Sequence, residues 1–309
     1  MYQGEFKMND DKLYYYTDYN TFKLILENST LRFKESTSSN DKLDTIQLYN
    51  ELFQMAKEKL NEKELKVEQK FYFDMLKNNG VHSSRIALVA CFTTKADSRM
   101  LWDAYTMHRK DREAVRYNGV CIEFSKSCLR SAMERSANIF DVKDCRNITY
   151  GFDGIRDYLE NIMDAFSVEV EELSKDKDQK QSYIPPIPVP GTKKVLELKK
   201  CIVIPLLHLI DEFDTEAPFI KHIFWEEENE IRALLSMKKG NRNVKKLGKN
   251  EDGSFFFDIV IDESCINKVI LGPEFSDIDI EEVNNINGKL PFNHLKMEHS
   301  RGTNIITNR

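Results

Sequence analysis

The N-terminal part of the chain alternates between apolar runs and polar loops. Lys12 to Thr17 (KLYYYT) predicts a short aromatic strand, and Asp18 is placed to cap a helix that contains Phe22 on its apolar side. Leu31 to Phe33 predicts another extended segment. The polar run at 35–44 is rich in residues that form turns through their side chains, so we expect a loop there.

The rest of the chain mixes strands with helices. The run at 86–92 (IALVACF) is continuously apolar, which is typical of a strand buried on both faces. Further strands are predicted at residues 119–124, 140–150, 255–261 and 268–271, and shorter helices at residues 98–108, 127–135 and 278–287. Long helical patterns occupy residues 46–78, 154–173 and 193–213, the last interrupted by Pro205.

This order of elements indicates an α+β fold with a mixed or antiparallel β-sheet core. We expect one elaborated domain over residues 1–309. Helical insertions at 46–78 and 154–213 account for the length beyond a domain of ~100–200 residues, and a Pro-rich linker at 183–191 lies inside the second insertion.

The composition favours a globular chain. Its 309 residues include 45 Lys and Arg against 51 Asp and Glu, which gives a net charge of -6, and 41% are hydrophobic. That fraction of hydrophobic residues is too high for a disordered chain. The sequence contains no run of about 18 uncharged apolar residues, which a membrane-spanning helix would need. The charged N-terminus lacks the apolar core of an export signal, so we expect a cytoplasmic protein without a membrane partner.

Cysteines and histidines do not indicate a metal site. The six cysteines form no CxxC pair, and the six histidines are scattered without an HExxH motif. We therefore expect reduced thiols, buried as small hydrophobic side chains, and no metal.

Two aromatic segments are candidates for a ligand site. In the first strand Tyr14 and Tyr16 share one face and Tyr15 lies on the other, so one face could stack an aromatic ligand. Trp102 and Tyr105 lie three residues apart in a predicted helix. Packing in the core is the alternative for both segments.

The late acidic segment FWEEENEIRALL is a candidate for catalytic chemistry. If it ends in a strand, Glu228, Glu230 and Arg232 share a face. Ile231 and Ala233 would then face the core. A carboxylate beside an arginine has a lowered pKa and stays ionised, so it could stabilise a developing cation or bind a ribose hydroxyl. The alternative is the solvated face of an acidic helix.

A basic segment follows at residues 238–249 (KKGNRNVKKLGK). With Gly240 and Gly248 it predicts a flexible connection between strands, and a solvated loop is its simplest interpretation. The other interpretation is contact with nucleic-acid phosphates. The side chains expected to make that contact are Lys238, Lys239, Arg242, Lys245 and Lys246.

Taken together, these segments resemble a family of bacterial and phage proteins catalogued as domain of unknown function 2971. Members of that family open with LYHYTS and continue to an NDPxE loop, which LYYYT at 13–17 and Asn40-Asp41 resemble. The similarity continues in the same order through CF at 91–92, LWDAY at 101–105, GVCIEF at 119–124, Lys221 with WxxExExR at 225–232, and ILGP at 270–273.

The layout also resembles the ADP-ribosyltransferase superfamily, particularly its DNA- and tRNA-directed branches, which implies a split-sheet cleft for NAD. By this resemblance Tyr15 takes the place of the histidine of the first motif, and Glu230, or alternatively Glu228, that of the late glutamate. In two places the chain departs from the pattern, since a tyrosine replaces the histidine and Lys42 to Asp44 replaces PxE. The residues implied to hold the nucleotide are Tyr16, Thr17, Arg32, Asn40, Trp102, Tyr105 and Arg232.

The resemblance implies NAD as the substrate and an ADP-ribosyltransferase-like activity toward nucleic acid or protein, in a toxin or an anti-phage defence effector. NAD glycohydrolysis is the other enzymatic outcome. The alternative is a non-catalytic module that recognises a nucleotide or a phage component, and the sequence leaves open whether the chain is an enzyme.

Overall fold

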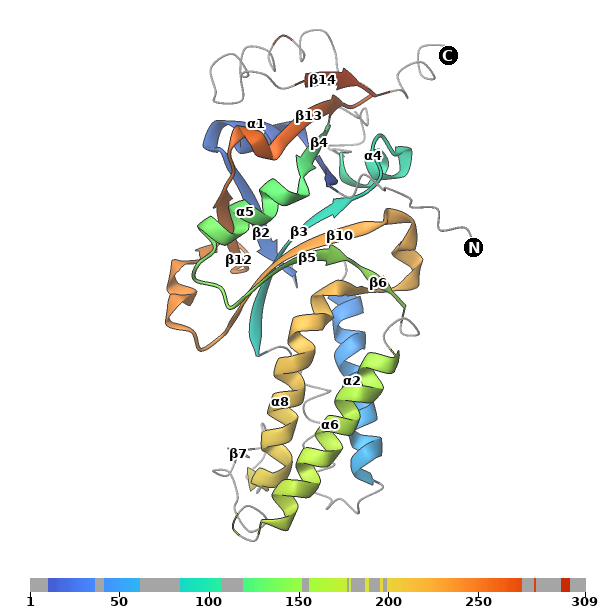
Figure 1. The fold of residues 1–309 in the computed structure, drawn as a ribbon, viewed down its shortest axis with the longest axis vertical. Helices are drawn as coiled ribbons and strands as arrows, with labels where there is room; N and C mark the ends of the chain where they lie inside the picture. The colour runs from blue at the N-terminus through green and yellow to red at the C-terminus, as the bar shows by residue number, and fades with distance from the viewer. Residues whose placement is uncertain are drawn as a thin grey trace, which may run out of the picture.

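A ten-stranded sheet forms the upper part of the molecule (Figure 1). The computed structural model describes residues 11–36, 42–61, 84–106, 119–151, 156–176, 178, 187–188, 195–196, 199–273, 281 and 296–300. The strands are β1 (Lys12–Thr17), β2 (Thr30–Glu35), β3 (Arg85–Thr93), β4 (Val120–Ser125), β5 (Val142–Asn147), β10 (Glu230–Lys238), β11 (Gly248–Lys249), β12 (Phe255–Val260), β13 (Ile266–Leu271) and β14 (Lys296–His299). Neighbouring strands are antiparallel except β13 and β14, which confirms the α+β class and the mixed sheet.

The sheet divides at β3. Along one edge β3 pairs with β10 over its whole length, and β10 pairs in turn with β5. Along the other edge Leu88 and Val89 pair with β2, whereas Thr93 pairs with β1. Among the described residues, the segment 90–92 between them has no register partner on that edge. We call the gap that opens here between β1 and β2 the fork of the sheet. Because successive residues of a strand direct their backbone N–H and C=O groups to opposite edges, at least one of these three residues directs them into the fork.

Two arms leave the fork. The first arm consists of β2, β12 and β11, and the second arm consists of β1, β4, β13 and β14. Phe33 pairs with Phe257 in the first arm, and Tyr15 pairs with Ile122 in the second. Such a split could not be inferred from strand patterns alone, because it depends on which residues of β3 pair with β1 and which pair with β2.

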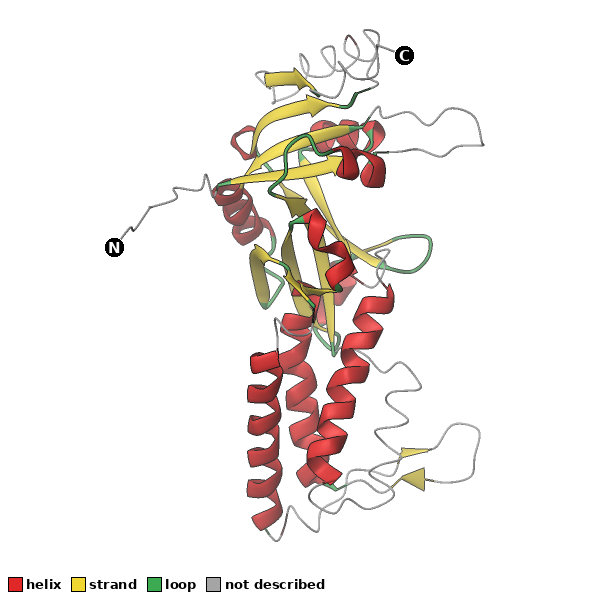
Figure 2. Cartoon of the chain, turned by 90° about the vertical axis from the view of Figure 1, so that its right-hand side faces the viewer, coloured by secondary structure: helices red, strands yellow, loops and turns green. Residues whose placement is uncertain are grey.

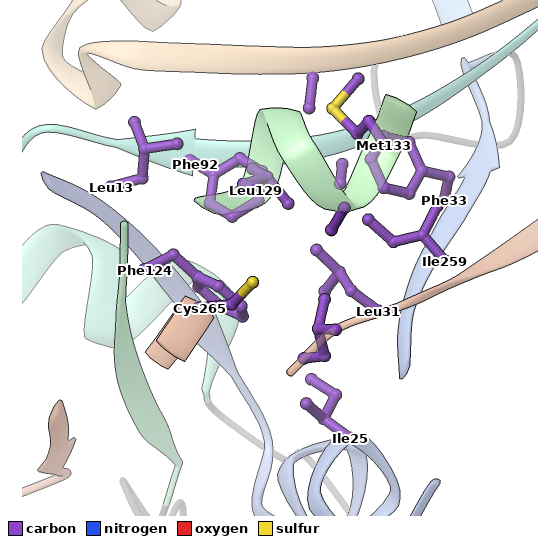
Figure 3. Close-up of a cluster of buried hydrophobic side chains, with 14 of the residues drawn as sticks. Leu13, Ile25, Leu31, Phe33, Phe92, Phe124, Leu129, Met133, Ile259 and Cys265 are labelled. Atoms are coloured by element: carbon purple, nitrogen blue, oxygen red, sulfur yellow. The ribbon is translucent and has the colours of Figure 1, made fainter. Parts of the chain in front are cut away.

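One face of the sheet is covered by α1 (Tyr19–Asn28) and α5 (Lys126–Ser136). Asp18 caps α1 by accepting a hydrogen bond from the backbone N–H of Thr21 at 2.9 Å, as predicted. Figure 3 shows the resulting core, in which Phe33, Phe92 and Phe124 from the strands lie near Leu129 of α5. Because successive side chains of a strand point to opposite faces, the other face of β1, β2 and β3 is left for polar side chains.

Three long helices, α2 (Lys42–Asn61), α6 (Arg156–Lys175) and α8 (Lys200–Glu216), project from the lower edge of the sheet (Figure 2). They have a core of their own, with Phe53, Phe166 and Phe213 buried. The expected helix at 193–213 is wrong at its start, because Val195–Leu196 (β8) pairs with Ile187–Pro188 (β7) and the helix begins only at Lys200. The expected helix at 46–78 lies outside the described residues beyond Asn61, as does the linker at 183–191 apart from β7.

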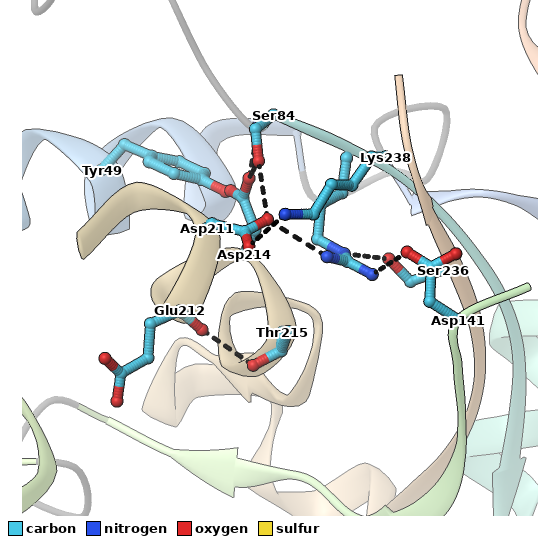
Figure 4. A network of polar contacts seen from close by, with 10 residues as sticks. Tyr49, Ser84, Asp141, Asp211, Glu212, Asp214, Thr215, Ser236 and Lys238 are labelled. Carbon is cyan, nitrogen blue, oxygen red and sulfur yellow. Dashed lines mark hydrogen bonds and ion pairs between the residues drawn. The ribbon is translucent and has the colours of Figure 1, made fainter. Parts of the chain in front are cut away.

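A polar network joins the helices to the sheet (Figure 4). The guanidinium of Arg85, at the start of β3, donates to Ser236 at 3.0 Å, Asp141 at 2.7 Å and Asp211 of α8 at 3.1 Å. Asp211 also pairs with Lys238 at 2.8 Å. The lower ends of β3 and β10 are therefore fixed against α8.

After α8 the chain passes through a 3-10 turn, η3 (Ala217–Phe219), and the short strand β9 (Ile220–Lys221), which pairs with β6 (Thr149–Tyr150). A second 3-10 segment, η4 (Ile223–Glu228), leads into β10. The acidic segment therefore ends in a strand, as expected for Glu230 and Arg232, whereas its first part is a 3-10 helix on which Glu226 and Glu227 are exposed, so the alternative of a solvated acidic helix face holds for that part only.

The remaining short elements are α4 (Arg99–Tyr105), η5 (Arg242–Lys246) and η6 (Glu263–Cys265). The helix expected at 278–287 lies outside the described residues, apart from Glu281. Within the described part of the chain, no helix is both long and apolar enough to cross a membrane.

Candidate functional site

A pocket of about 240 Å³ opens at the fork of the sheet. Its floor is the part of β3 that β1 and β2 leave uncovered, and η4 and α4 border one side. The pocket is lined by Tyr14, Tyr15, Tyr16, Arg32, Lys34, Glu35, Val89, Ala90, Cys91, Phe92, Thr93, Leu101, Tyr105, Glu228 and Glu230.

Strand register explains why these side chains meet. Tyr14 is the register partner of Thr93, and Thr93 is the partner of Glu230 on the next strand. Residues paired in this way project from the same face of a sheet. Lys34 is paired with Val89, four residues earlier on β3, so it lies about 13 Å from the Glu230 end along the strand.

Glu230 is a buried carboxylate held by two cations. Its Oε1 accepts a hydrogen bond from Arg232 Nε at 2.7 Å, and its Oε2 lies 3.2 Å from Lys221 Nζ. Burial alone would raise the pKa of Glu230, but Arg232 and Lys221 outweigh it and lower the pKa to about 2. The prediction of an ionised carboxylate beside an arginine is therefore confirmed for Glu230.

Glu228 converges on the same lysine. Its Oε2 lies 2.7 Å from Lys221 Nζ, and its Oε1 accepts a hydrogen bond from the Tyr105 hydroxyl at 2.8 Å. Asn229 between the two glutamates has a left-handed φ of 47°. This turn from η4 into β10 directs both carboxylates toward Lys221, although Glu228 does not belong to the strand.

The three tyrosines of β1 occupy the pocket in different ways. Tyr14 donates to Glu123 at 3.2 Å, and Tyr16 donates to the backbone carbonyl of Lys95 at 3.1 Å. The Tyr15 ring points to the core side, where it packs on Phe92 at a centroid distance of 5.6 Å. Burial raises the pKa of Tyr15 to about 12, so its hydroxyl stays protonated at neutral pH.

Cys91 lies in the pocket floor, next to Glu230 and Arg232. It is the one residue of β3 with an exposed side chain, in an otherwise buried strand. Although the side chain faces the open pocket, the protein packed around the pocket floor desolvates the thiol, and this together with the neighbouring Glu230 charge raises its pKa to about 12. A thiol with that pKa is neutral at pH 7 and is a poor nucleophile. Cys91 is thus a wall of the pocket and a partner of Glu230, whose pKa its hydrogen bond helps to lower.

The structure brings together most of the residues that the sequence nominated for catalysis and nucleotide binding. Six of them line the pocket, namely Tyr15, Tyr16, Arg32, Tyr105, Glu228 and Glu230. Arg232 is 8% exposed and lies behind Glu230, where it supports that carboxylate. Asn40 lies outside the described residues.

Besides Arg232, two further residues implied to hold the nucleotide are not pocket walls. Trp102 is 2% exposed, donates its Nε1–H to Asp97 at 2.9 Å and stacks edge-on against Tyr16, so the alternative of core packing applies. Thr17 is buried at the end of β1 and does not line the pocket. Its position explains this, because the pocket uses the part of β1 that lies beside Thr93.

The basic segment is remote from the carboxylates. Lys238 pairs with Arg85 at the opposite end of β10 from Glu230, about 27 Å along the strand, and is held by Asp211. Lys239, Arg242, Lys245 and Lys246 are exposed around η5, which confirms a connection between strands. Contact with nucleic acid at these residues stays a prediction.

Sequence reasoning missed Cys91, Thr93 and Lys34 as pocket residues. A period-two pattern in β2 (TLRFKE) places Arg32 and Lys34 together on a polar face, which was an available signal for Lys34. No comparable signal marks Cys91, because a cysteine in a continuous apolar run is typical of a buried strand.

The described residues contain no group of three or more His, Cys, Asp and Glu side chains that could hold a metal ion. The pocket at the fork of the sheet is lined by three tyrosines, by the carboxylates of Glu228 and Glu230, which are paired with Lys221 and Arg232, and by the basic side chains of Arg32 and Lys34.

Residues 101–233 match the model of a protein family of unknown function, DUF2971. The match supports the family resemblance seen in the sequence, and it covers most of α4, all of β4, Glu228 at the end of η4 and the start of β10 with Glu230. No curated protein and no solved structure matches the chain. The similarity to ADP-ribosyltransferases accordingly stays a hypothesis.

Proposed function

We propose that the fork pocket binds the nicotinamide riboside part of NAD and that the chain is an ADP-ribosyltransferase-like enzyme. The observation that carries the proposal is an ionised Glu230 at the wall of a tyrosine-lined pocket. A fixed negative charge beside an aromatic surface suits a ligand with a cationic ring attached to a ribose. Where 90–92 has no register partner among the described residues, the backbone groups that face the fork offer donors and acceptors to a carboxamide.

The proposed reaction breaks the bond between ribose C1′ and the nicotinamide nitrogen. The bonding electrons leave with nicotinamide, which becomes neutral, and positive charge develops on the ribose. Glu230 stabilises that charge, and it needs no change of protonation because its pKa is already low. A nucleophile then forms the new bond to C1′ and loses its proton to solvent or to a nearby carboxylate such as Glu228.

The acceptor distinguishes transfer from glycohydrolysis. Water as the acceptor would give an NAD glycohydrolase, whereas a protein or nucleic-acid group would give a transferase. A role as a toxin or an anti-phage defence effector rests on the family resemblance alone.

Nicotinamide release from NAD by the purified protein tests the proposal. We expect release by the wild type and a loss of roughly 100-fold or more in Glu230→Gln, since a charge that acts on the transition state is removed. Glu226→Gln is a matched control, because Glu226 is an exposed carboxylate in the same segment. Tyr105→Phe, which only removes the hydrogen bond to Glu228, keeps the test informative if Glu230→Gln folds poorly. No release by a folded wild-type protein, with lysate and nucleic acid present as acceptors, would contradict the proposal.

The second candidate is a non-catalytic module that binds a nucleotide. Lys221 and Arg232 already neutralise both carboxylates, and the pocket is smaller than the ~300–1,000 Å³ of typical ligand sites. Calorimetry discriminates the two candidates. Binding of NAD at the pocket without nicotinamide release would favour the module.

A further inference from the structure

The two ends of the fork pocket differ in their charges. At the end toward the second arm, the ionised carboxylates of Glu228 and Glu230 form ion pairs with Lys221 and Arg232. At the end toward the first arm, some 13 Å away along β3, the pocket wall carries Arg32 and Lys34, together with the carboxylate Glu35. A ligand that spans the pocket therefore meets acceptors at one end and donors at the other.

Among the basic side chains that line this pocket, Lys34 is not engaged by the neighbouring carboxylates that the structure describes. It is exposed, and it makes no ion pair with any residue that the structure describes. The nearest carboxylate in sequence, Glu35, accepts a hydrogen bond from the backbone N–H of Phe255 at 2.9 Å, which directs it toward β12. An ammonium group has three donors, and these are available to an anion in the pocket.

Arg32 is fixed in place but keeps free donors. Its Nε and Nη2 each donate to Asp258 at 2.8 Å, and its guanidinium lies 3.8 Å from the centre of the Phe256 ring. The Phe256 ring lies directly over Gly248, where an added Cβ would meet ring atoms at 2.3–2.6 Å. Asp258 accepts hydrogen bonds from Nε and Nη2, so Nη1 is left for a second acceptor.

We infer that Lys34, assisted by Arg32, forms a diphosphate subsite at the first-arm end of the fork pocket. This inference rests on the proposed function and extends it, because it fixes the direction of the ligand. The ribose that reacts lies at Glu230, and the diphosphate runs along β3 toward Lys34. A pocket of about 240 Å³ holds only part of a dinucleotide, so the remaining nucleoside extends beyond the Lys34 end of the pocket.

Binding of two ligands that differ in their phosphates tests the subsite. ADP-ribose carries the diphosphate and nicotinamide riboside carries none, and both are titrated calorimetrically into the full-length protein. We expect Lys34→Gln to weaken ADP-ribose binding roughly tenfold or more, as loss of a charge-assisted hydrogen bond does, and to leave nicotinamide riboside binding unchanged. Lys34→Arg should retain most of the ADP-ribose affinity. Lys239→Gln is the control, since Lys239 is equally exposed but lies at the far end of β10.

The inference is overturned if wild-type protein does not bind ADP-ribose. It is also overturned if Lys34→Gln binds ADP-ribose as the wild type does, if it loses both ligands equally, or if Lys239→Gln weakens ADP-ribose binding as much. The test is separable from the proposed function. A Lys34-dependent ADP-ribose site without nicotinamide release would support the subsite and refute the enzyme, whereas nicotinamide release that is unaffected by Lys34→Gln would do the reverse.

Discussion

The charged side chains at the fork are buried, and each is stabilised by an oppositely charged neighbour. Glu230 and Lys221 are each 5% exposed, and a charge in such surroundings needs a partner. Lys221 comes from β9 and Arg232 from β10, so the site depends on the turn between these two strands. Removal of one charge leaves the others unpaired, which makes the carboxylates important for stability as well as for the proposed chemistry.

The pH dependence of stability should reveal the Glu230 charge. Its folded-state pKa of about 2 lies below the ordinary value of 4.5, so its ionisation stabilises the fold fully above pH 4.5 and the contribution is lost as the pH falls toward 2. The contribution is about 3 kcal/mol. Urea unfolding from pH 7 to pH 3 should show the free-energy gap between wild type and Glu230→Gln narrowing with acid. A gap that stays constant would contradict this assignment.

Tyr105→Phe isolates one hydrogen bond. The Tyr105 hydroxyl donates to Glu228, and the ring is 42% exposed, so removal of the hydroxyl should cost about 1 kcal/mol or less in unfolding free energy. Nicotinamide release should fall much more than stability does, because Glu228 loses its orientation. An unchanged rate would place Glu228 outside the proposed chemistry.

The residues of the site were predictable to different degrees. The alternation of polar and apolar residues predicted Tyr15 and Tyr16 on opposite faces, and charge pairing predicted the ionised Glu230 beside Arg232. The same alternation did not reveal which polar positions of β2 and β3 border a cavity. Lys34 and Cys91 become pocket residues only because β1 and β2 pair with different halves of β3.

Elements were easier to predict than their connections. Caps, apolar runs and turn residues predicted β1, α1, β3, β4 and α5 close to their observed bounds, because each is specified by local sequence. The start of α8 was not predicted, since Val195–Leu196 joins a two-residue strand pair that carries no local signal. The fork depends on register between distant segments, which single-strand patterns do not contain.

The close approach of the chain at Gly119, between the ends of β1 and β4, predicts that a larger residue there destabilises the fold. A Cβ added at Gly119, just before β4, would lie 2.2 Å from Thr106 Cβ and 2.7 Å from the Thr17 carbonyl oxygen. Gly119→Ala should therefore destabilise the protein by about 1–3 kcal/mol. At Gly240 an added Cβ meets nothing within 4 Å, so Gly240→Ala should stay within about 0.5 kcal/mol of the wild type. Equal effects in chemical denaturation would contradict the packing at Gly119.

The whole molecule consists of a forked sheet and a helical projection that share their anchoring residues. Arg85 connects the lower ends of β3, β5 and β10 to α8. The chain then runs from α8 through Pro218, whose carbonyl accepts a hydrogen bond from Arg232, to Lys221. The helices and the fork pocket are therefore linked through both ends of β10.

Arg85→Met tests this connection. The Arg85 side chain is 5% exposed, but its carboxylate partners are 33–39% exposed and partly screened by water, so we expect a cost of about 1–3 kcal/mol. Hydrogen exchange should increase in α8 more than in α5. Arg135→Met is the control, because the Arg135–Asp262 pair is exposed and should be worth about 0–1 kcal/mol. Uniform exchange changes over the whole chain would contradict a local anchor.

A crystal structure of the protein with ADP-ribose tests the central claim most directly. We expect the ligand in the fork of the sheet, with its terminal ribose beside Glu228 and Glu230 and its diphosphate within hydrogen-bond distance of Lys34. An ADP-ribose molecule bound away from the fork, or a fork pocket that stays empty at saturating ligand, would contradict it.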